Sequence, residues 1–396
     1  MKKYNLINNS LGWLCFVIAA VTYLLTIEPT ASFWDCPEFI LQGAKLEVGH
    51  PPGNPIFMLA ARFFVTLFGG NIQSAAVAVN CMSALLSAAT ILLLFWTITH
   101  LTRRLIVKDS DESISPVKIA VIMGAGLCGA LAYTWSDTFW FSAVEGEVYA
   151  FSSFCTALVF WLILKWENHA DEPHSDRYLV LIAYIIGVSI AVHLLNLLCI
   201  PAIGLVYYYR KFKNINAVGS LIALGISCVI VALILYGLVP GFINVAQWFE
   251  LFFVNELGCG YNVGVTVYAA VAVFVFVMTV RALYHQRSSL SIKWLFFFTI
   301  VLSGMPFIGN SWVIPTLFII GLLVYLFMFC PKVPVRVFNV IALSILVIFI
   351  GYSSYALLLI RASANPPMNQ NAPDNVFALA SYLNREQYGD RPLFYG

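Results

Sequence analysis

Long apolar segments, separated by short polar ones, run through almost the whole chain. About eleven of them have the roughly 15–25 residues that a bilayer span needs, and they lie at residues 11–27, 74–99, 117–135, 148–166, 178–194, 195–209, 217–238, 263–281, 292–307, 310–330 and 337–360. Residues 55–69 are apolar too, but they are short and contain Arg62, which predicts an interfacial or re-entrant helix. The pattern predicts an all-α polytopic membrane protein with about eleven transmembrane helices.

Composition favours repeated membrane spans over a single anchor. The 396 residues are 61% hydrophobic and only 10% charged, whereas soluble domains are about a quarter charged. Mean hydropathy is +0.87. The net charge of +2 comes with no basic stripe, no glycine-rich phosphate loop and no zinc-type spacing. We therefore expect no nucleic-acid partner.

The N-terminal segment has some features of a signal peptide. Lys2 and Lys3 precede an apolar run from Leu11 to about Ile27. This run is long for a signal core, and no small-x-small cleavage site follows it. We therefore expect a retained first span.

The distribution of lysine and arginine predicts the topology. If residues 178–194 and 195–209 form a hairpin, about 16 of the 21 Lys and Arg residues fall on the side of the N-terminus. One long helix at this place would invert every later loop and remove the bias. Because positive residues in short loops mark the cytoplasmic side, the N-terminus is expected in the cytoplasm and the protein in the inner membrane. External loops 28–73 and 136–147 and the tail would then be periplasmic.

The cysteines do not indicate a disulfide framework. Most of the nine lie in apolar segments, where cysteine behaves as a small hydrophobic residue. Cys36 and Cys259 fall in predicted external loops. A bridge between them is left open, although two free thiols are the favoured interpretation.

The first external loop gathers charged groups that the chain uses sparingly elsewhere. Residues 35–38 fit a capping box, with Asp35 as the N-cap and Glu38 at the third helical position. The same placement would let Asp35 act as a general base on a hydroxyl, or bind a metal, with Glu38 beside it. Lys45, His50 and Arg62 could hold a phosphate; for His50 a bond to a carbonyl is the plain alternative.

Two further external segments carry candidates. Glu145 and Glu147 are one residue apart among aromatic residues, and an extended backbone would let both carboxylates share a cation. Ordinary solvated loop acids are the alternative, but ionisable groups pressed against a membrane domain are site candidates. His193 and Asn196 lie in an apolar turn, where buried hydrogen-bond partners are the plain interpretation. All these groups would reach one membrane face.

Several separated motifs together resemble the DUF2723 family, whose members are similar to protein O-mannosyltransferases of the GT-C superfamily. The resemblance covers residues from about 10 to 396. The motifs are FWDCPEFI, GHPPGNP, FWFSAVEGEVYAFSSF, HLLNLLCIPA and SYLNREQYGDRPLFYG.

The resemblance implies a GT-C-like fold with a long first external loop and an inverting sugar transfer from a polyprenyl phosphate. It matches the first-loop acid to Asp35, with Glu38 close by, and an acidic pair to Glu145 and Glu147. Some relatives hold a divalent metal at that pair, so a metal is left open and no other cofactor is expected.

We thus predict a GT-C-like transmembrane catalytic domain at residues 1–360 and an external tail at 361–396, either truncated or packed back, with a short helix capped by Asp374 and ending near Gln387. The predicted function is transfer of mannose or a similar hexose from a polyprenyl-phosphate donor to a hydroxyl acceptor, Ser or Thr of exported proteins. A transporter or flippase of lipid-linked sugars and a non-catalytic membrane scaffold are the alternatives.

Overall fold

Helices account for the regular structure of this chain. The computed structural model describes residues 2–107, 114–309 and 311–389, and no strand occurs among them. Within these ranges, seven helices are long and apolar enough to cross a membrane, and three shorter apolar helices accompany them. The predicted all-α polytopic membrane protein is confirmed, while the number of eleven spans stays a prediction.

The chain divides into two compact units. The first comprises Met1–Gly49, Asn54–Tyr178 and Val188–Cys199, and the second His50–Gly53, Leu179–Gly187 and Ile200–Gly396. Helix α8 (Asp176–Ile190) contributes to both. The other helices of the first unit are α1 (Lys2–Leu25), α2 (Cys36–Lys45), α3 (Pro55–Leu67), α4 (Ala75–Ile106), α5 (Pro116–Thr134), α6 (Asp137–Ala143), α7 (Val148–His169) and the 3-10 helix η1 (Leu194–Cys199).

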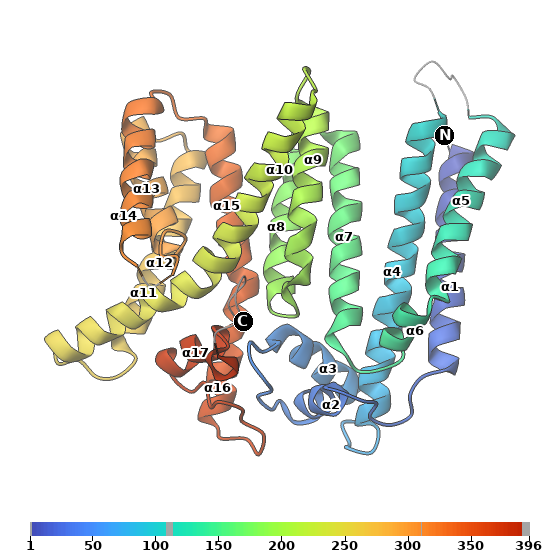
Figure 1. The fold of residues 1–396 in the computed structure, drawn as a ribbon, viewed down its shortest axis with the longest axis horizontal. Helices are drawn as coiled ribbons and strands as arrows, with labels where there is room; N and C mark the ends of the chain where they lie inside the picture. The colour runs from blue at the N-terminus through green and yellow to red at the C-terminus, as the bar shows by residue number, and fades with distance from the viewer. Residues whose placement is uncertain (1, 108–113, 310, 390–396) are drawn as a thin grey trace. The chain divides into compact units, whose positions relative to one another are not determined.

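Helix α4 is the central helix of the first unit. It packs against α1, α5 and α7, and against the shorter helices α2 and α3. Small residues, Ala84 and Ala88 on α4 and Ala19 on α1, line the contact in one buried cluster and let the backbones approach closely. The Tyr23 hydroxyl of α1 donates to the Thr134 carbonyl of α5, at 2.9 Å. In Figure 1 the long helices α1, α4, α5 and α7 run side by side, with α2, α3 and α6 at one end.

The second unit is built around an aromatic cluster. Tyr268, Phe276 and Phe296 are buried in it, and the rings of Phe296 and Phe338 stack at 4.1 Å. The helices and turns of this unit are α9 (Ile200–Lys211), α10 (Ala217–Ala232), η2 (Leu233–Leu238), α11 (Val239–Leu251), η3 (Phe252–Glu256), α12 (Val263–Tyr284), α13 (Ser289–Leu302), α14 (Val313–Val324), η4 (Tyr325–Phe329), α15 (Val335–Tyr352), η5 (Ser353–Tyr355), α16 (Ala356–Ser363), α17 (Val376–Leu383) and η6 (Glu386–Tyr388).

Two boundaries test the sequence analysis directly. Helix α8 ends at Ile190, and helical structure resumes at Leu194, so the predicted break between residues 178–194 and 195–209 is confirmed. The end predicted at residue 238 is wrong, because the helix that begins at Ala217 continues to Glu256. Pro240 would normally end it, but the π-helical turn η2 precedes the proline and loosens the hydrogen-bond ladder there.

The tail after Arg361 packs back on the second unit. Val376, Leu379 and Ala380 of α17 join the buried aromatic cluster, and Tyr382 is fully buried. The expected packing of the tail on the membrane domain is thus seen for α17 (Val376–Leu383).

The cap and the end of the tail helix differ from expectation. The side chain of Asn375, rather than Asp374, accepts from the backbone N–H groups of Phe377 and Ala378, each at 3.0 Å. The helix ends at Leu383 instead of Gln387. Asp374 instead accepts from the Asn375 amide at 2.8 Å, because an Asx side chain caps best from the position directly before the first helical turn.

We expect Gly187→Ala to lower the free energy of unfolding by about 1–3 kcal/mol through overpacking. A Cβ at Gly187 would lie 2.6 Å from backbone atoms of Ile348 on α15. Gly225→Ala on α10 is the matched control, because nothing lies within 4 Å of its Cβ, and should be neutral or stabilising by about 0.5–1 kcal/mol. Thermal unfolding in detergent compares the two, and equal melting temperatures would contradict the tight contact.

Candidate active site

Asp35 lies directly before α2, as predicted, but it does not cap the helix. Its backbone is helical (φ −86°, ψ −2°) and its side chain makes no capping hydrogen bond, whereas an N-cap residue is typically extended. Glu38 accepts from the Gln42 amide at 3.1 Å. The capping-box interpretation is therefore wrong for Asp35, whose side chain is exposed and available to solvent.

The end of the first loop folds back over α2. A Cβ at Gly49 would collide with the side chains of Glu38 and Gln42, so the backbone at Gly49 lies close against both side chains. Glu47, two residues earlier, is buried to 2% exposure. The sequence analysis did not assign Glu47 to the site, since its only sequence signal is its place between Lys45 and His50.

The two candidate cations near α2, Arg62 and Lys45, have different surroundings. Arg62 of α3 is half-buried, and its guanidinium donates to the Ala44 carbonyl at the end of α2. A cation suits the C-terminal end of a helix, where carbonyl groups lack helical partners. Lys45, the last residue of α2, is exposed. Arg62 therefore holds α2 and α3 together, a role that the sequence did not reveal.

The second external loop places its acids in a buried turn. Glu145 and Glu147 are 4% and 5% exposed, so they are not solvated loop acids. The Glu147 N–H donates to the Glu145 carbonyl at 3.0 Å, which closes a three-residue turn. The chain turns here between the short helix α6 and the start of α7, although the backbone of Glu147 itself is extended (φ −123°, ψ 153°).

Hydrogen bonds join this turn to the start of the first loop. The Glu28 N–H donates to the Val144 carbonyl at 3.1 Å. The Asn80 amide of α4 donates to the carbonyl groups of Glu28 and Thr30, at 2.7 and 3.1 Å. The Trp140 indole donates to the Thr26 hydroxyl at 2.9 Å. The two loops are thus one connected structure.

The start of α2 packs against the acidic turn. A Cβ at Gly146 would lie 3.0 Å from Asn80 Oδ1 of α4 and 3.4 Å from the Ile40 side chain of α2. Burial raises the pKa of the Cys36 thiol, and the charges of Glu145 and Glu147 raise it further. The structure therefore brings the Asp35 helix and the acidic pair together, as the sequence analysis expected. Cys36 and Cys259 are both free thiols.

Glu145 is the acid whose environment is most unusual for a carboxylate. Burial raises its pKa, a hydrogen bond from Ser32 lowers it, and the charge of Glu28 raises it. Its Oε2 atom is buried and has no hydrogen-bond partner among the described residues. Burial of this kind favours the neutral form of a carboxyl group, and an unpartnered oxygen can bind a donor or a cation. A metal at Glu145 and Glu147 stays a prediction.

The turn after α8 completes the first-unit part of the site. The His193 ring lies 5.5 Å from the Tyr149 ring of α7, and its Nδ1 accepts from the Leu195 N–H at 3.2 Å. The Ile56 N–H of α3 donates to the Ala191 carbonyl at 3.1 Å. His193 is half-buried and hydrogen-bonded within its own turn, and its role in the site stays a prediction.

Asn196 behaves differently from His193. It is 1% exposed, and both its amide atoms are without a hydrogen-bond partner among the described residues. The plain interpretation of a buried hydrogen-bond partner is wrong for this residue. A buried amide without partners is unfavourable by about 1–3 kcal/mol, which makes Asn196 a candidate for contact with a ligand.

His50 belongs to the second unit together with the turn that follows it. Its carbonyl accepts from the Gly53 N–H at 3.0 Å and from the Tyr382 hydroxyl at 3.1 Å. The Tyr355 hydroxyl donates to the Gly53 carbonyl at 3.4 Å. The backbone of the turn is thus held by two tyrosines, and the role of the His50 imidazole stays a prediction.

The second unit contains a cavity that the sequence analysis did not predict. Its volume is about 540 Å³. The loop after α13 and the residues after α17 line it, with both charges of the Arg385–Glu386 pair at its wall. Because its residues come from separate segments with no shared motif, no local pattern in the sequence marks it.

Comparisons with known proteins find similarity in the part of the chain that holds most of these candidate residues. Residues 35–216 match the family model described as the N-terminal domain of protein O-mannosyl-transferase TMEM260. This region resembles a protein O-mannosyltransferase. The match begins at Asp35 and includes every candidate residue from there to Asn196. The DUF2723 and GT-C assignments stay predictions.

Two curated proteins are also similar in sequence to this chain. The protein O-mannosyl-transferase tmem260 of Dictyostelium discoideum is 25% identical over 189 residues, which are 46% of this chain and 21% of the relative. TMEM260 of Mus musculus is 25% identical over 175 residues, 44% of this chain and 22% of the relative. The matched segments thus span about a fifth of these relatives. No solved structure matches the chain.

Replacing Arg62 and Lys45 separately by glutamine should distinguish their roles. We expect Arg62→Gln to lower the free energy of unfolding by about 1–2 kcal/mol, because the bond to the Ala44 carbonyl is lost. Lys45→Gln makes the same charge change at an exposed position and should leave stability unchanged. Thermal unfolding of both variants measures this difference. A destabilised Lys45 variant beside an unaffected Arg62 variant would contradict the assignment.

Glu145→Gln should stabilise the protein at neutral pH. The pKa of Glu145 is raised in the folded state, so ionisation above that pKa opposes folding, and the penalty disappears below the carboxyl pKa of the unfolded chain. The Gln variant should therefore melt higher than the wild type near pH 7.5, and the gap should close by about pH 4. A gap that persists unchanged at pH 4 would mean that titration of Glu145 is not its cause.

Proposed function

We propose that this chain is a membrane glycosyltransferase that moves mannose or a similar hexose from a polyprenyl-phosphate donor to a Ser or Thr hydroxyl of an exported protein. The observation that carries the proposal is the pairing of an exposed acid, Asp35, with the buried turn of Glu145 and Glu147 at one end of the membrane helices. The likeness of residues 35–216 to a protein O-mannosyltransferase supports the reaction class.

Asp35 is the proposed general base. Its carboxylate takes the proton of the acceptor hydroxyl as the hydroxyl oxygen forms a bond to the anomeric carbon of the sugar. The bond between that carbon and the phosphate oxygen breaks, and the polyprenyl phosphate leaves with the electron pair. Attack opposite to the leaving group inverts the anomeric configuration. The exposure of Asp35 at the start of α2 supports this role, because a protein acceptor has to reach the base from the aqueous side.

The buried acids have a different proposed task. Glu145 and Glu147 orient the sugar hydroxyls, or hold a divalent cation that would screen the donor phosphate. Glu38, on the first turn of α2, supports Asp35. His193 and Asn196 line the sugar side, where the unpartnered amide of Asn196 would gain hydrogen bonds.

The leaving phosphate needs positive charge. Lys45 is exposed at the end of α2, so we assign the main electrostatic stabilisation to it. Arg62 is engaged with the Ala44 carbonyl, and its remaining N–H groups and the His50 imidazole are secondary candidates. The polyprenyl tail would lie against the apolar helix surfaces in the bilayer.

The charge bias of the loops supports a periplasmic active site in the inner membrane. The start of α1, with Lys2 and Lys3, lies at the opposite end of the first unit from α2 and α6 (Figure 1). If that end is cytoplasmic, the acids face the periplasm, where lipid-linked sugars and exported proteins meet.

Asp35→Asn should abolish transfer without unfolding the protein. Loss of a general base lowers a rate about 10²–10⁴-fold, so transfer from polyprenyl-phosphate mannose to Ser/Thr peptides should fall by at least about 10²-fold. The matched control is Asp137→Asn, an exposed acid in the first turn of α6, which should stay within about twofold of the wild type. Equal thermal stability of the variants completes the comparison.

The transporter alternative makes the opposite forecast. In proteoliposomes a flippase would move the intact lipid-linked sugar, leave its glycosidic bond unbroken, and tolerate Asp35→Asn. Transfer that survives in the Asp35 variant at wild-type rate would remove Asp35 as the base. Movement of the lipid-linked sugar without any sugar transfer would favour the transporter hypothesis over the enzyme hypothesis.

A further inference from the structure

The first unit has a polar cavity at the end that carries the N-terminus. Its volume is about 350 Å³, and residues of α1, α4 and α7 line it. In Figure 1 this end of the three helices lies away from α2 and α3. None of the residues proposed for sugar transfer lines it, so the cavity is separate from the candidate active site.

The cavity wall is basic. Arg103 and His100 of α4 and Lys165 of α7 line it, and no carboxylate occurs among its described lining residues. The Arg103 guanidinium lies 5.2 Å from the centre of the Tyr4 ring. The Lys165 ammonium lies 4.9 Å from that of Trp161. Each cation thus lies over an aromatic face, an attraction that helps to fix its position at the cavity wall.

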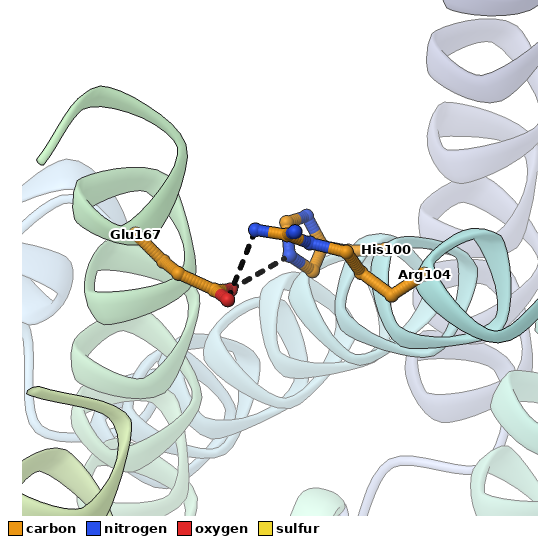
Figure 2. A network of polar contacts seen from close by, with 3 residues as sticks. All are labelled: His100, Arg104 and Glu167. Atoms are coloured by element: carbon orange, nitrogen blue, oxygen red, sulfur yellow. Dashed lines mark hydrogen bonds and ion pairs between the residues drawn. The ribbon is translucent and has the colours of Figure 1, made fainter. Parts of the chain in front are cut away.

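A nearby carboxylate engages a different arginine. Figure 2 shows Glu167 between Arg104, at 2.9 Å, and His100, at 3.4 Å. Glu167 and Arg104 do not line the cavity, whereas Arg103, the next residue on α4, does. Two adjacent arginines therefore have different surroundings, one facing a carboxylate and one facing the cavity.

Amide groups add hydrogen-bonding capacity beside the cations. Asn5, Asn8 and Asn9 of α1 and Asn168 of α7 line the cavity. The Asn8 side-chain oxygen is buried and has no partner among the described residues. Since the oxygen and nitrogen of an amide are exchangeable by a flip, Asn8 can offer a donor to a bound anion. Amides and cations together provide the donors that phosphate oxygens accept.

The other side of the cavity is aromatic and faces the lipid. The rings of Trp96 and Trp161 stack at 5.7 Å, and Trp13 meets Trp96 edge-on at 6.5 Å. Trp13 is 53% exposed, and so is Val17, one turn further along α1, at 51%. Tryptophans of this kind mark the level of lipid headgroups. An acyl chain could lie along α1 below them.

We propose that this cavity binds the phosphate of an anionic membrane phospholipid, with Arg103, Lys165 and Asn8 as the donors. Basic pockets between membrane helices are a recurrent way to hold such headgroups. The exposed apolar surface of α1 at the rim favours a lipid over a free anion, because a soluble phosphate would gain nothing from it. The proposal does not depend on the transferase activity.

Native mass spectrometry of the full chain in detergent tests the proposal. The protein is titrated in separate arms with phosphatidylglycerol, phosphatidylcholine and inorganic phosphate. We expect one phosphatidylglycerol to bind at least about tenfold more tightly than phosphatidylcholine. Arg103→Gln and Lys165→Gln should each weaken that binding about tenfold, since each removes a charge-assisted hydrogen bond, and Arg103→Lys should retain most of it.

Arg104→Gln is the matched control, because it removes the same charge one residue away from the cavity and should stay within about twofold of the wild type. Equal weakening by Arg103→Gln and Arg104→Gln would overturn the proposal in favour of a diffuse surface charge effect. Equal affinity for the two lipids would overturn it as well. Displacement of the lipid by an equal concentration of inorganic phosphate would identify a soluble phosphate ligand instead.

Discussion

The burial of carboxylates against the ends of apolar helices is the constraint on which the first unit depends. Glu145 and Glu147 lie in a turn that is nearly closed to solvent, where an isolated charge is strongly unfavourable. Hydrogen bonds from nearby polar groups lower this cost. Ser32 donates to Glu145, and the Asn80 amide donates to carbonyl groups of the first loop. The same hydrogen bonds fix both loops, so the acids and the loop geometry stabilise one another.

This arrangement divides the acids into two classes. Asp35 is exposed and makes no capping bond at the start of α2. Glu145 is buried, with a raised pKa and an unpartnered oxygen. Two carboxyl groups in such different environments suit different tasks. In the proposed reaction, the exposed acid would act as base for an acceptor that approaches from water, and the buried acid would position the sugar.

Much of the fold was predictable, because membrane spans and helix breaks depend on the local hydropathy and charge of the sequence. The break after Ile190 followed from charge bias alone, and the start of α2 from Asp35 and the proline after it. The helix that runs on to Glu256 was not predictable, since the π-turn before Pro240 depends on packing. The burial of Glu47 and the bond from Arg62 to the Ala44 carbonyl were hidden for the same reason: each depends on segments that meet only in the folded chain.

The two proposed sites of the first unit lie at opposite ends of its long helices and differ in charge. Acids gather at the end with α2 and α6, and the basic cavity of Arg103 and Lys165 lies at the other end. Anionic lipids are attracted to basic groups at the headgroup level, and positive charge resists translocation. If the basic end faces the cytoplasm, as we propose, an anionic lipid bound there would hold it at that leaflet. A fixed basic end keeps α1, α4 and α7 in register, and these are the helices whose opposite ends carry the loops of the acids.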